Sequence, residues 1–382
     1  MIYLDNAATS FPKPPEVIKA VDLSMKLYGA NPGRSGHKMS VDAAFQVYKC
    51  REMLDSFFNG YGAELVSFFP NCTYALNTAI KGIVKKGDHI IISSLEHNSV
   101  LRPVHKLKEE GVAEYSVFSV TEAIGETLEN FRQAFKDNTT LCVVTAVSNA
   151  FGNILPLKEL SEIAHKNGAL FFVDGAQGAG VVELDMKNQG IDCLCVPGHK
   201  GLLGPMGTGA LLHKGLPFSS IIEGGTGTAS FDFSQPEMYP ERLESGTLNV
   251  PGICGLKKGV EIVSKRGVSN IFKRESRLCS RLYKSLQEIP EVKLYQGNYN
   301  PKYFAPLVSF NVGDLHSEQV SAYLNENGIA VRGGFHCAPL AHISNNTQKQ
   351  GAVRASPSAF NTEKDINFLL NLVRKIAIYR NI

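Results

Sequence analysis

Short apolar runs alternate with amphipathic segments along most of the chain. A nearly continuous apolar run predicts a buried strand, and apolar positions at helical spacing predict one face of a helix. On this basis strands are predicted at residues 64–69, 89–94, 114–120, 140–148, 169–174, 191–196 and 208–213. Helices are predicted at residues 14–28, from an N-cap at Ser40, and at 73–84, 100–110, 127–135 and 157–168. This alternation favours an α/β fold with a mostly parallel sheet between helices.

The rhythm of the pattern changes after about Pro251. Helices at 256–265 and 271–287, strands at 306–312, 328–334 and 351–356, and a last helix at 363–379 are predicted there. We therefore expect a large domain over residues 16–252 and a smaller C-terminal α/β domain formed by residues 1–15 and 253–382. Ligands of open α/β sheets bind beyond the carboxyl ends of the strands, so we expect functional residues directly after strands.

Composition excludes several classes of protein. The 382 residues exceed an ordinary single domain, and 39 basic against 36 acidic residues give a net charge of +3, which favours neither nucleic acid nor membrane as a partner. No apolar run is long enough to cross a bilayer, and the N-terminal "MIYLDNAATS" lacks the pattern of a signal peptide. We expect a cytoplasmic protein.

The cysteines give no sign of a metal site. There are eight, and none forms a CxxC pair, so neither metal binding nor a disulfide framework is predicted. Cys193 and Cys195 alternate as residues on one face of a strand do. Cys337, in "RGGFHCAPLAH", could be a buried filler, a ligand or a nucleophile.

Two charged residues follow predicted strands. Asp174 ends the strand at 169–174, where a carboxylate could be a cap, a turn acid or the counter-charge of a cationic ring nitrogen. Lys200 follows the strand at 191–196 within "PGHKG". It could be an exposed loop lysine, or an imine-forming lysine whose amine is partly desolvated.

Two further positions lie after strands. Asn71-Cys72-Thr73 opens a helix whose N–H groups and hydroxyl suit a phosphate, although an ordinary N-cap looks the same. His97 could be a capping or core histidine, or an aromatic plate. A phosphate seat, an aromatic plate, a carboxylate and a lysine together are the parts that hold pyridoxal 5'-phosphate.

These motifs resemble those of the class V aminotransferase-like cysteine desulfurases, which are fold-type I pyridoxal phosphate enzymes. The resemblance covers nearly the whole chain, through "YLDNAATS", "LEHNS", "VSNAFG", "VDGAQG", "PGHKG", "GGTGT", "ESGTLN", "RGGFHCAP" and "VRASPSAFNT". The "H-C-A" form at Cys337 is similar to the branch that contains SufS and selenocysteine lyase. The resemblance implies a homodimer with a shared active site.

The resemblance also implies roles in holding the cofactor. Lys200 forms the Schiff base, Asp174 pairs with the pyridine nitrogen, and Gln177 donates to the phenolic oxygen. His97 stacks on the ring. The phosphate is held by Thr73, the backbone of Cys72, His199 and Thr228 of the partner subunit.

Further residues are assigned to the substrate and to sulfur transfer. Arg354 matches the residue that binds the substrate carboxylate through two parallel hydrogen bonds, although a surface ion pair is the alternative. Asn149 lies near the substrate and the phenolic oxygen, and Asn6 is also assigned to the substrate. Cys337 matches the catalytic cysteine, which acts as a thiolate. The adjoining Gly333-Gly334 pair gives its loop backbone freedom.

The implied activity is conversion of L-cysteine to L-alanine. Lys200 removes the Cα proton with His97 as an acid–base helper, and Cys337 takes the sulfur as a persulfide and passes it to an acceptor that the sequence does not identify. The alternatives are a selenocysteine lyase or other β-lyase, and a class V aminotransferase. A non-catalytic sulfur carrier would have lost Lys200 or Asp174. Pro197 and Phe335 depart from the family pattern, where a hydroxyl residue and a histidine are common.

Overall fold

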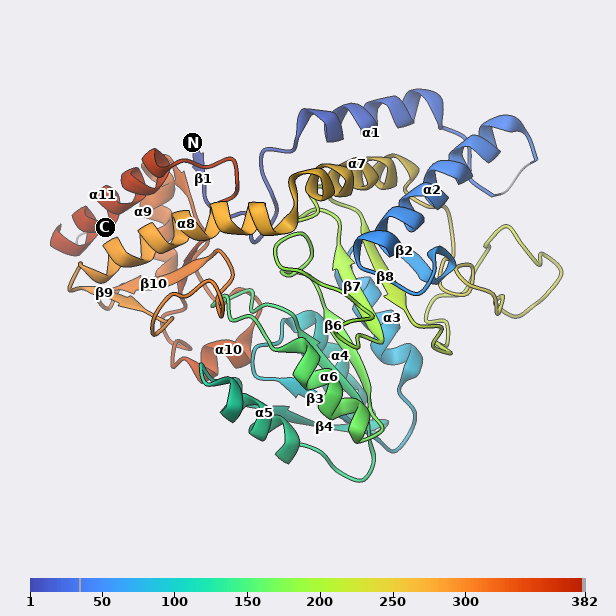
Figure 1. Cartoon of the computed structure of the whole chain (residues 1–382), viewed down its shortest axis with the longest axis horizontal. Coiled ribbons are helices and arrows are strands. Elements are labelled where there is room, and N and C mark those ends of the chain that lie inside the picture. Colours follow the sequence, from blue (N-terminus) through green and yellow to red (C-terminus); the bar gives the residue numbers. More distant parts are fainter. Residues whose placement is uncertain (34–35, 380–382) are drawn as a thin grey trace.

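The computed structural model describes residues 1–33 and 36–379, which form a larger and a smaller α/β part (Figure 1). The larger part contains a seven-stranded sheet in the order β2-β8-β7-β6-β5-β3-β4. Its strands are β2 (Val66–Phe69), β3 (Asp88–Ser93), β4 (Ala113–Phe118), β5 (Thr139–Thr145), β6 (Leu170–Asp174), β7 (Cys193–Pro197) and β8 (Gly209–His213). β8 runs antiparallel to β2 and β7, and the other pairs are parallel. The predicted mostly parallel sheet is confirmed.

Helices cover both faces of this sheet because its strands are apolar on both sides. Ile90 and Ile92 of β3 face the core against α3 (Cys72–Ile83) and α4 (Asn98–Glu109), whereas Ile91 faces the opposite core. That second core includes side chains from α2 (Lys38–Phe57), α5 (Ile124–Gln133), α6 (Leu157–Lys166) and α7 (Val250–Arg266). α1 (Pro15–Leu27) packs along the outside of α7, as Figure 1 shows. Cys193 and Cys195 both lie on the α3 face, as their alternation predicted.

The smaller part has its own core. It contains the antiparallel sheet β12-β10-β9 and the parallel pair β1-β11. Its elements are β1 (Ile2–Tyr3), α8 (Val268–Gln287), β9 (Val292–Leu294), β10 (Val308–Val312), α9 (Ser317–Glu326), β11 (Ile329–Ala330), α10 (Pro339–Ser344), β12 (Val353–Ala355) and α11 (Glu363–Tyr379). The N-terminal strand thus lies beside C-terminal elements, on the left of Figure 1.

Two details differ from the sequence-based expectations. Ser40 is not the N-cap of α2: His37 caps it, because its Nδ1 accepts from the Ser40 N–H at 3.2 Å. The expected boundary between residues 252 and 253 falls within α7, which packs into the larger core through Ile253, Leu256 and Val260. We therefore place the end of the large domain near Gly267, between α7 and α8. No helix in the described ranges is long and apolar enough to cross a bilayer.

Candidate active site

The carboxyl ends of β2, β3, β5, β6 and β7 meet at one edge of the large sheet, because these strands run in the same direction. The loops that follow them bring most of the predicted site residues around one cavity. The predicted residues that line it are Cys72, Thr73, His97, Asn149, Asp174, Gln177, His199 and Lys200.

Asp174 lies at the bottom of this cavity, fully buried at the end of β6. Its Oδ1 accepts from the Ala176 N–H at 2.8 Å and from the Cys72 thiol, with 3.7 Å between sulfur and oxygen. Burial raises the pKa of Asp174, and the Ala176 N–H, the Lys200 charge and the Cys72 thiol oppose that rise. The carboxylate therefore depends on cationic and N–H partners for its charge.

Lys200 faces Asp174 across the cavity from the loop after β7. Burial lowers the pKa of its amine, the charges of Arg354 and Arg332 lower it further, and Asp174 opposes the shift. A lysine whose pKa is lowered by desolvation spends more time as the free amine, which is the nucleophilic and basic form. The residue type and its surroundings therefore suit imine formation and proton transfer.

Two histidines border the cavity in neutral form. Burial lowers the pKa of both His97 and His199 to about 4, with help from the Lys200 charge. His97 is the N-cap of α4, where its Nδ1 accepts from the Ser99 N–H at 3.0 Å, so Nε2 carries the ring hydrogen. The ring of His97 is thereby held as a flat, uncharged surface at the cavity wall.

The donors and acceptors of the cavity fit the expected cofactor. His199 Nδ1 and Asn149 Oδ1 are buried without a hydrogen-bond partner among the described residues. The first turn of α3 adds the backbone N–H groups of Cys72 and Thr73, which have no acceptor within the helix. These groups, an Asp174 carboxylate and the helix N-terminus match a phosphorylated, nitrogen-containing aromatic ring.

Arg354 is fully buried and rigidly held beside Asn149. Its Nη2 donates to Asp5 Oδ1 and its Nη1 to the Asn149 carbonyl, both at 2.7 Å. Its Nε is buried without a partner in the part of the chain that the structure describes. Burial lowers the pKa of Arg354 and Asp5 raises it, but a guanidinium remains charged at any ordinary pH. An anionic substrate group is the natural partner of its free N–H groups.

The Cys337 loop is held by three hydrogen bonds, one of which comes from Asn149 in the cavity wall. The Asn98 N–H donates to the Cys337 carbonyl at 2.8 Å, and Asn149 Nδ2 donates to the His336 carbonyl at 2.6 Å. His336 Nε2 lies 3.0 Å from the Ala352 carbonyl. These bonds hold His336 and Cys337 at φ values of 49° and 56°, which side chains rarely adopt. The Cys337 thiol is exposed in a groove next to the cavity, and it does not line the cavity itself.

Arg332 is a charged residue to which the sequence analysis gave no role. Its Nη2 lies 3.9 Å from Cys337 Sγ, and its charge also lowers the pKa of Lys200 and of His97. The guanidinium therefore contacts the thiol and also contributes to the electrostatics of the cavity. Its position at the start of "RGGFHC" was the available signal.

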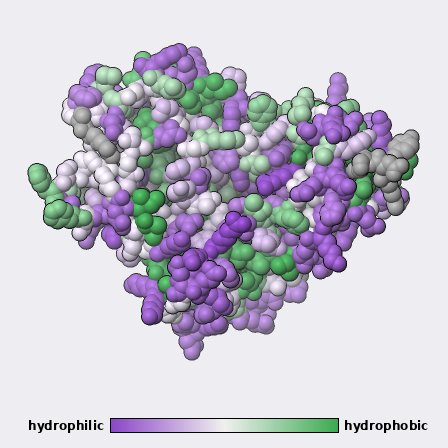
Figure 2. Space-filling model, turned by 180° about the vertical axis from the view of Figure 1, so that it is seen from behind, coloured by the Kyte–Doolittle hydropathy of each residue, from purple (hydrophilic) through white to green (hydrophobic). Residues whose placement is uncertain are grey.

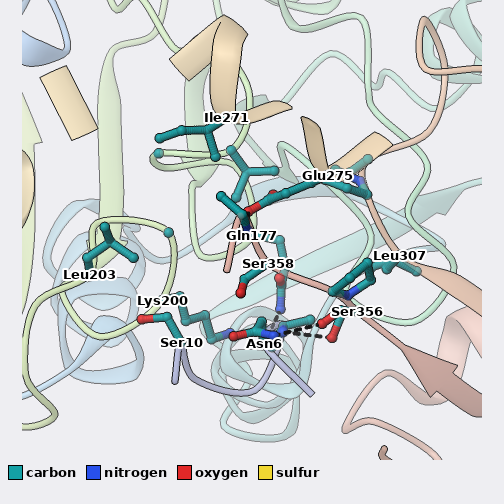
Figure 3. Close-up of a pocket in the computed structure, with 18 of the residues that line it drawn as sticks. Asn6, Ser10, Gln177, Lys200, Leu203, Ile271, Glu275, Leu307, Ser356 and Ser358 are labelled. Atoms are coloured by element: carbon teal, nitrogen blue, oxygen red, sulfur yellow. Dashed lines mark hydrogen bonds between the residues drawn. The ribbon is translucent and has the colours of Figure 1, made fainter. Parts of the chain in front are cut away.

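Like Arg354 and Cys337, the predicted residues Asn6 and Thr228 do not line this cavity. Asn6 uses its amide to hold the N-terminal segment: Nδ2 donates to the Ser356 carbonyl at 3.0 Å, and Oδ1 accepts from the Phe11 N–H at 3.1 Å. It lines a second cavity, between the two domains, which also contains Lys200 (Figure 3). Thr228 is exposed in the segment between β8 and α7 and does not reach either cavity.

Comparison with known proteins places this geometry among related enzymes. The family model described as aminotransferase class-V matches residues 2–369. The chain is 33% identical to a probable cysteine desulfurase of Methanothermobacter thermautotrophicus, over 98% of this chain and 94% of that protein. It is 32% identical to a cysteine desulfurase of Escherichia coli, over 98% and 93%. The apo structure of a cysteine desulfurase from Thermococcus onnurineus superposes with a TM-score of 0.91 at 32% identity, covering 99% of this chain and 94% of that one.

Proposed function

The chain belongs to the aminotransferase class-V family, and from this premise we propose that it is a cysteine desulfurase that uses pyridoxal 5'-phosphate. The family and the cysteine desulfurases within it are pyridoxal phosphate enzymes. One observation carries the proposal: a cysteine loop is hydrogen-bonded to the wall of a lysine-containing cavity. A transaminase requires the cavity but has no use for the thiol.

We propose that eight residues of the cavity wall hold the cofactor. Lys200 binds its aldehyde carbon, Asp174 pairs with the ring nitrogen, and His97 stacks on the ring. Gln177 and Asn149 contact the phenolic oxygen. The phosphate binds to the first turn of α3, at Cys72 and Thr73, and to His199. Bound in this way, the cofactor supplies an electron sink for negative charge at the substrate Cα.

The protein side chains supply the remaining chemistry. The Arg354 guanidinium orients the carboxylate of L-cysteine, and the Lys200 amine removes the Cα proton. The Cys337 thiolate then bonds to the substrate sulfur while the Cβ–S bond breaks and its electron pair stays with the carbon fragment. That fragment takes up protons and leaves as L-alanine, and Cys337 retains the sulfur as a persulfide. Neutral His97 relays a proton through its ring N–H.

We propose that the enzyme is a homodimer in which Thr228 of the partner subunit completes the phosphate site. The segment that carries Thr228 projects from the body of the protein, at the right of Figure 1. Phe231 and Phe233 in it are fully exposed, and Figure 2 shows green-tinted side chains on the projection at its left edge. Two large apolar rings without cover on a projecting segment favour burial against a second copy.

The persulfide acceptor is proposed to carry a thiol, either on a protein or in a small molecule. Cys337 is open to solvent, and its groove is bordered by Arg102, Phe335 and Ile343. An incoming thiol can therefore reach the outer sulfur without entering the cofactor cavity.

Replacing Cys337 by alanine tests the proposal. We expect C337A to bind the cofactor with unchanged visible absorbance and to lose persulfide formation and alanine release from L-cysteine. Cys142→Ala is the matched control, because it removes a buried thiol of β5 that lies in the core with α2 and α6. This variant should keep the cofactor absorbance and the activity on L-cysteine. Desulfuration of L-cysteine that persists in C337A refutes the role. Turnover of selenocysteine alone would identify a selenocysteine lyase, and dependence on a keto acid would identify an aminotransferase.

A further inference from the structure

The two oxygens of the Asp174 carboxylate have different surroundings. Oδ1 accepts both hydrogen bonds that the carboxylate makes, one from the Ala176 N–H and one from the Cys72 thiol. Oδ2 accepts none from any residue in the described ranges, and Asp174 lines the cofactor cavity. One oxygen is therefore held by the protein, and the other is left for a ligand.

The position of the Cys72 side chain allows its thiol to donate a hydrogen bond to Asp174. It is buried at the first position of α3, and its backbone N–H points out of the helix end while its sulfur turns toward β6. Burial and the Asp174 charge raise the pKa of this thiol well above its usual value, so it keeps its hydrogen. A thiol in this position can only stabilise the carboxylate, whereas a thiolate would repel it.

Two further thiols, those of Cys193 and Cys195, lie near the carboxylate on β7. Cys195 is the cross-strand neighbour of Asp174, and Cys193 lies two residues earlier on the same face of β7. Both are packed with Cys72 in the same apolar core. Among the described residues neither Cys193 nor Cys195 is hydrogen-bonded to Asp174, so Cys72 is the side chain whose hydrogen bond restrains rotation of the carboxylate.

We propose that Cys72 is a positioning residue for Asp174: its thiol holds Oδ1 so that Oδ2 meets the cofactor ring nitrogen, and it keeps the carboxylate anionic and the ring nitrogen protonated. This inference rests on the proposed function. It assigns a role to the side chain of Cys72, separate from that of its backbone at the phosphate.

The sign of the effect follows from the hydrogen bond. A donor to a carboxylate lowers its basicity, as the Cys72 thiol does for Asp174. Without that donor, Asp174 binds a proton more readily and competes better with the ring nitrogen for the shared hydrogen. The carboxylate is also freer to rotate, so the cofactor is held less firmly.

The test measures cofactor binding and the protonation of its ring, and uses Cys72→Ala, Cys72→Ser and the control Cys142→Ala. Pyridoxal 5'-phosphate labelled with ¹⁵N at the ring is bound to each holoenzyme, and its NMR shift and dissociation constant are recorded. In C72A we expect the shift to move toward that of the unprotonated ring and the dissociation constant to rise about threefold to tenfold, the effect of one hydrogen bond. C72S restores a donor and should return both values toward wild type, and C142A should change neither.

Other outcomes overturn the proposal. A wild-type shift and dissociation constant in a folded C72A would show that the thiol does not act on the ring. An equal loss of cofactor affinity in C72A and C72S, with a lower melting temperature of the apo protein and an unchanged ¹⁵N NMR shift, would show that Cys72 has only a packing role. If C72A does not fold, C72S decides, because a shift displaced from wild type despite its hydroxyl would contradict donation. Failure of the wild-type protein to bind the cofactor would instead refute the proposed function.

Discussion

Asp5→Asn tests how the buried guanidinium of Arg354 is held. Among the described residues, Asp5 is the one carboxylate paired with that cation. Its Oδ1 lies 2.7 Å from Arg354 Nη2, and the side chains of Arg354 and Asp5 are 1% and 19% exposed. The amide keeps the size and one acceptor of the carboxylate but removes its charge. The substitution therefore leaves a buried cation without a counter-charge while changing little else.

The expected magnitude is large for stability and moderate for binding. Removing one partner of a buried ion pair costs about 3 kcal/mol or more. Unfolding 382 residues releases about 0.8 kcal/mol/K of entropy, so the melting temperature should fall by about 4 °C. A guanidinium that turns away from its set orientation binds the substrate carboxylate less well, and we expect KM for L-cysteine to rise about tenfold, which corresponds to about 1.4 kcal/mol.

Thermal unfolding and steady-state kinetics measure the two effects. Glu363→Gln is the matched control, because it neutralises the partner of Arg277 in an exposed ion pair of the same domain, where the two side chains are 78% and 43% exposed. Exposed pairs contribute about 0–1 kcal/mol, so E363Q should move the melting temperature by about 1 °C at most. An unchanged melting temperature and KM in D5N, or an equal loss in E363Q, would refute the reasoning.

Three further variants probe other parts of the structure. Replacing Phe231 and Phe233 by serine should shift the protein from dimer to monomer in sedimentation, because it removes the apolar cover expected for the second copy, and a persistent dimer would contradict this. Asn149→Ala leaves the buried His336 carbonyl without its donor, so we expect about 1–3 kcal/mol lower stability in denaturant and slower persulfide formation. A wild-type rate of persulfide formation would show that this hydrogen bond does not affect the chemistry. Burial raises the pKa of Glu275 from 4.5 to about 8, so the unfolded chain ionises first and stability is lost as the pH rises through that interval. Glu275→Gln should therefore reduce the fall in melting temperature between about pH 5 and pH 9, and an identical slope would disprove that sign.

The large sheet could be predicted because its strands are short apolar runs between polar turns. The prediction at 89–94 compares with β3 at Asp88–Ser93, and the prediction at 169–174 with β6 at Leu170–Asp174. β9 (Val292–Leu294) was missed because three residues, one of them an exposed lysine, are too few to show the alternation of apolar and polar positions that indicates a strand. α9 (Ser317–Glu326) was missed because it buries few apolar side chains. The cap at His37 was misjudged because an imidazole nitrogen is a less common acceptor than a hydroxyl.

The residues of the cavity could be predicted one by one from the sequence, but the contacts between their side chains could not. Lys200 and Asp174 each follow a strand, and a parallel sheet brings such positions together whatever lies between them in sequence. The contact of Arg332 with Cys337, and that of the Cys72 thiol with Asp174, depend on side-chain rotation. No spacing rule describes rotation, so these two contacts were out of reach.

The bonds around Cys337 explain why one fold can serve both halves of the proposed reaction. Asn149, on the loop after β5, donates to the cysteine loop with its side chain and accepts from Arg354 with its carbonyl. The proposed substrate-binding cation, the loop of the proposed nucleophile and the large sheet are thus joined at Asn149, although Arg354 and Cys337 belong to the smaller domain. A change in the angle between the domains must therefore move the thiol and the cation together relative to Lys200. It follows that substitutions which loosen this junction should affect substrate binding and sulfur transfer in parallel, whereas those at Cys72 or His199 should act through the affinity for the cofactor.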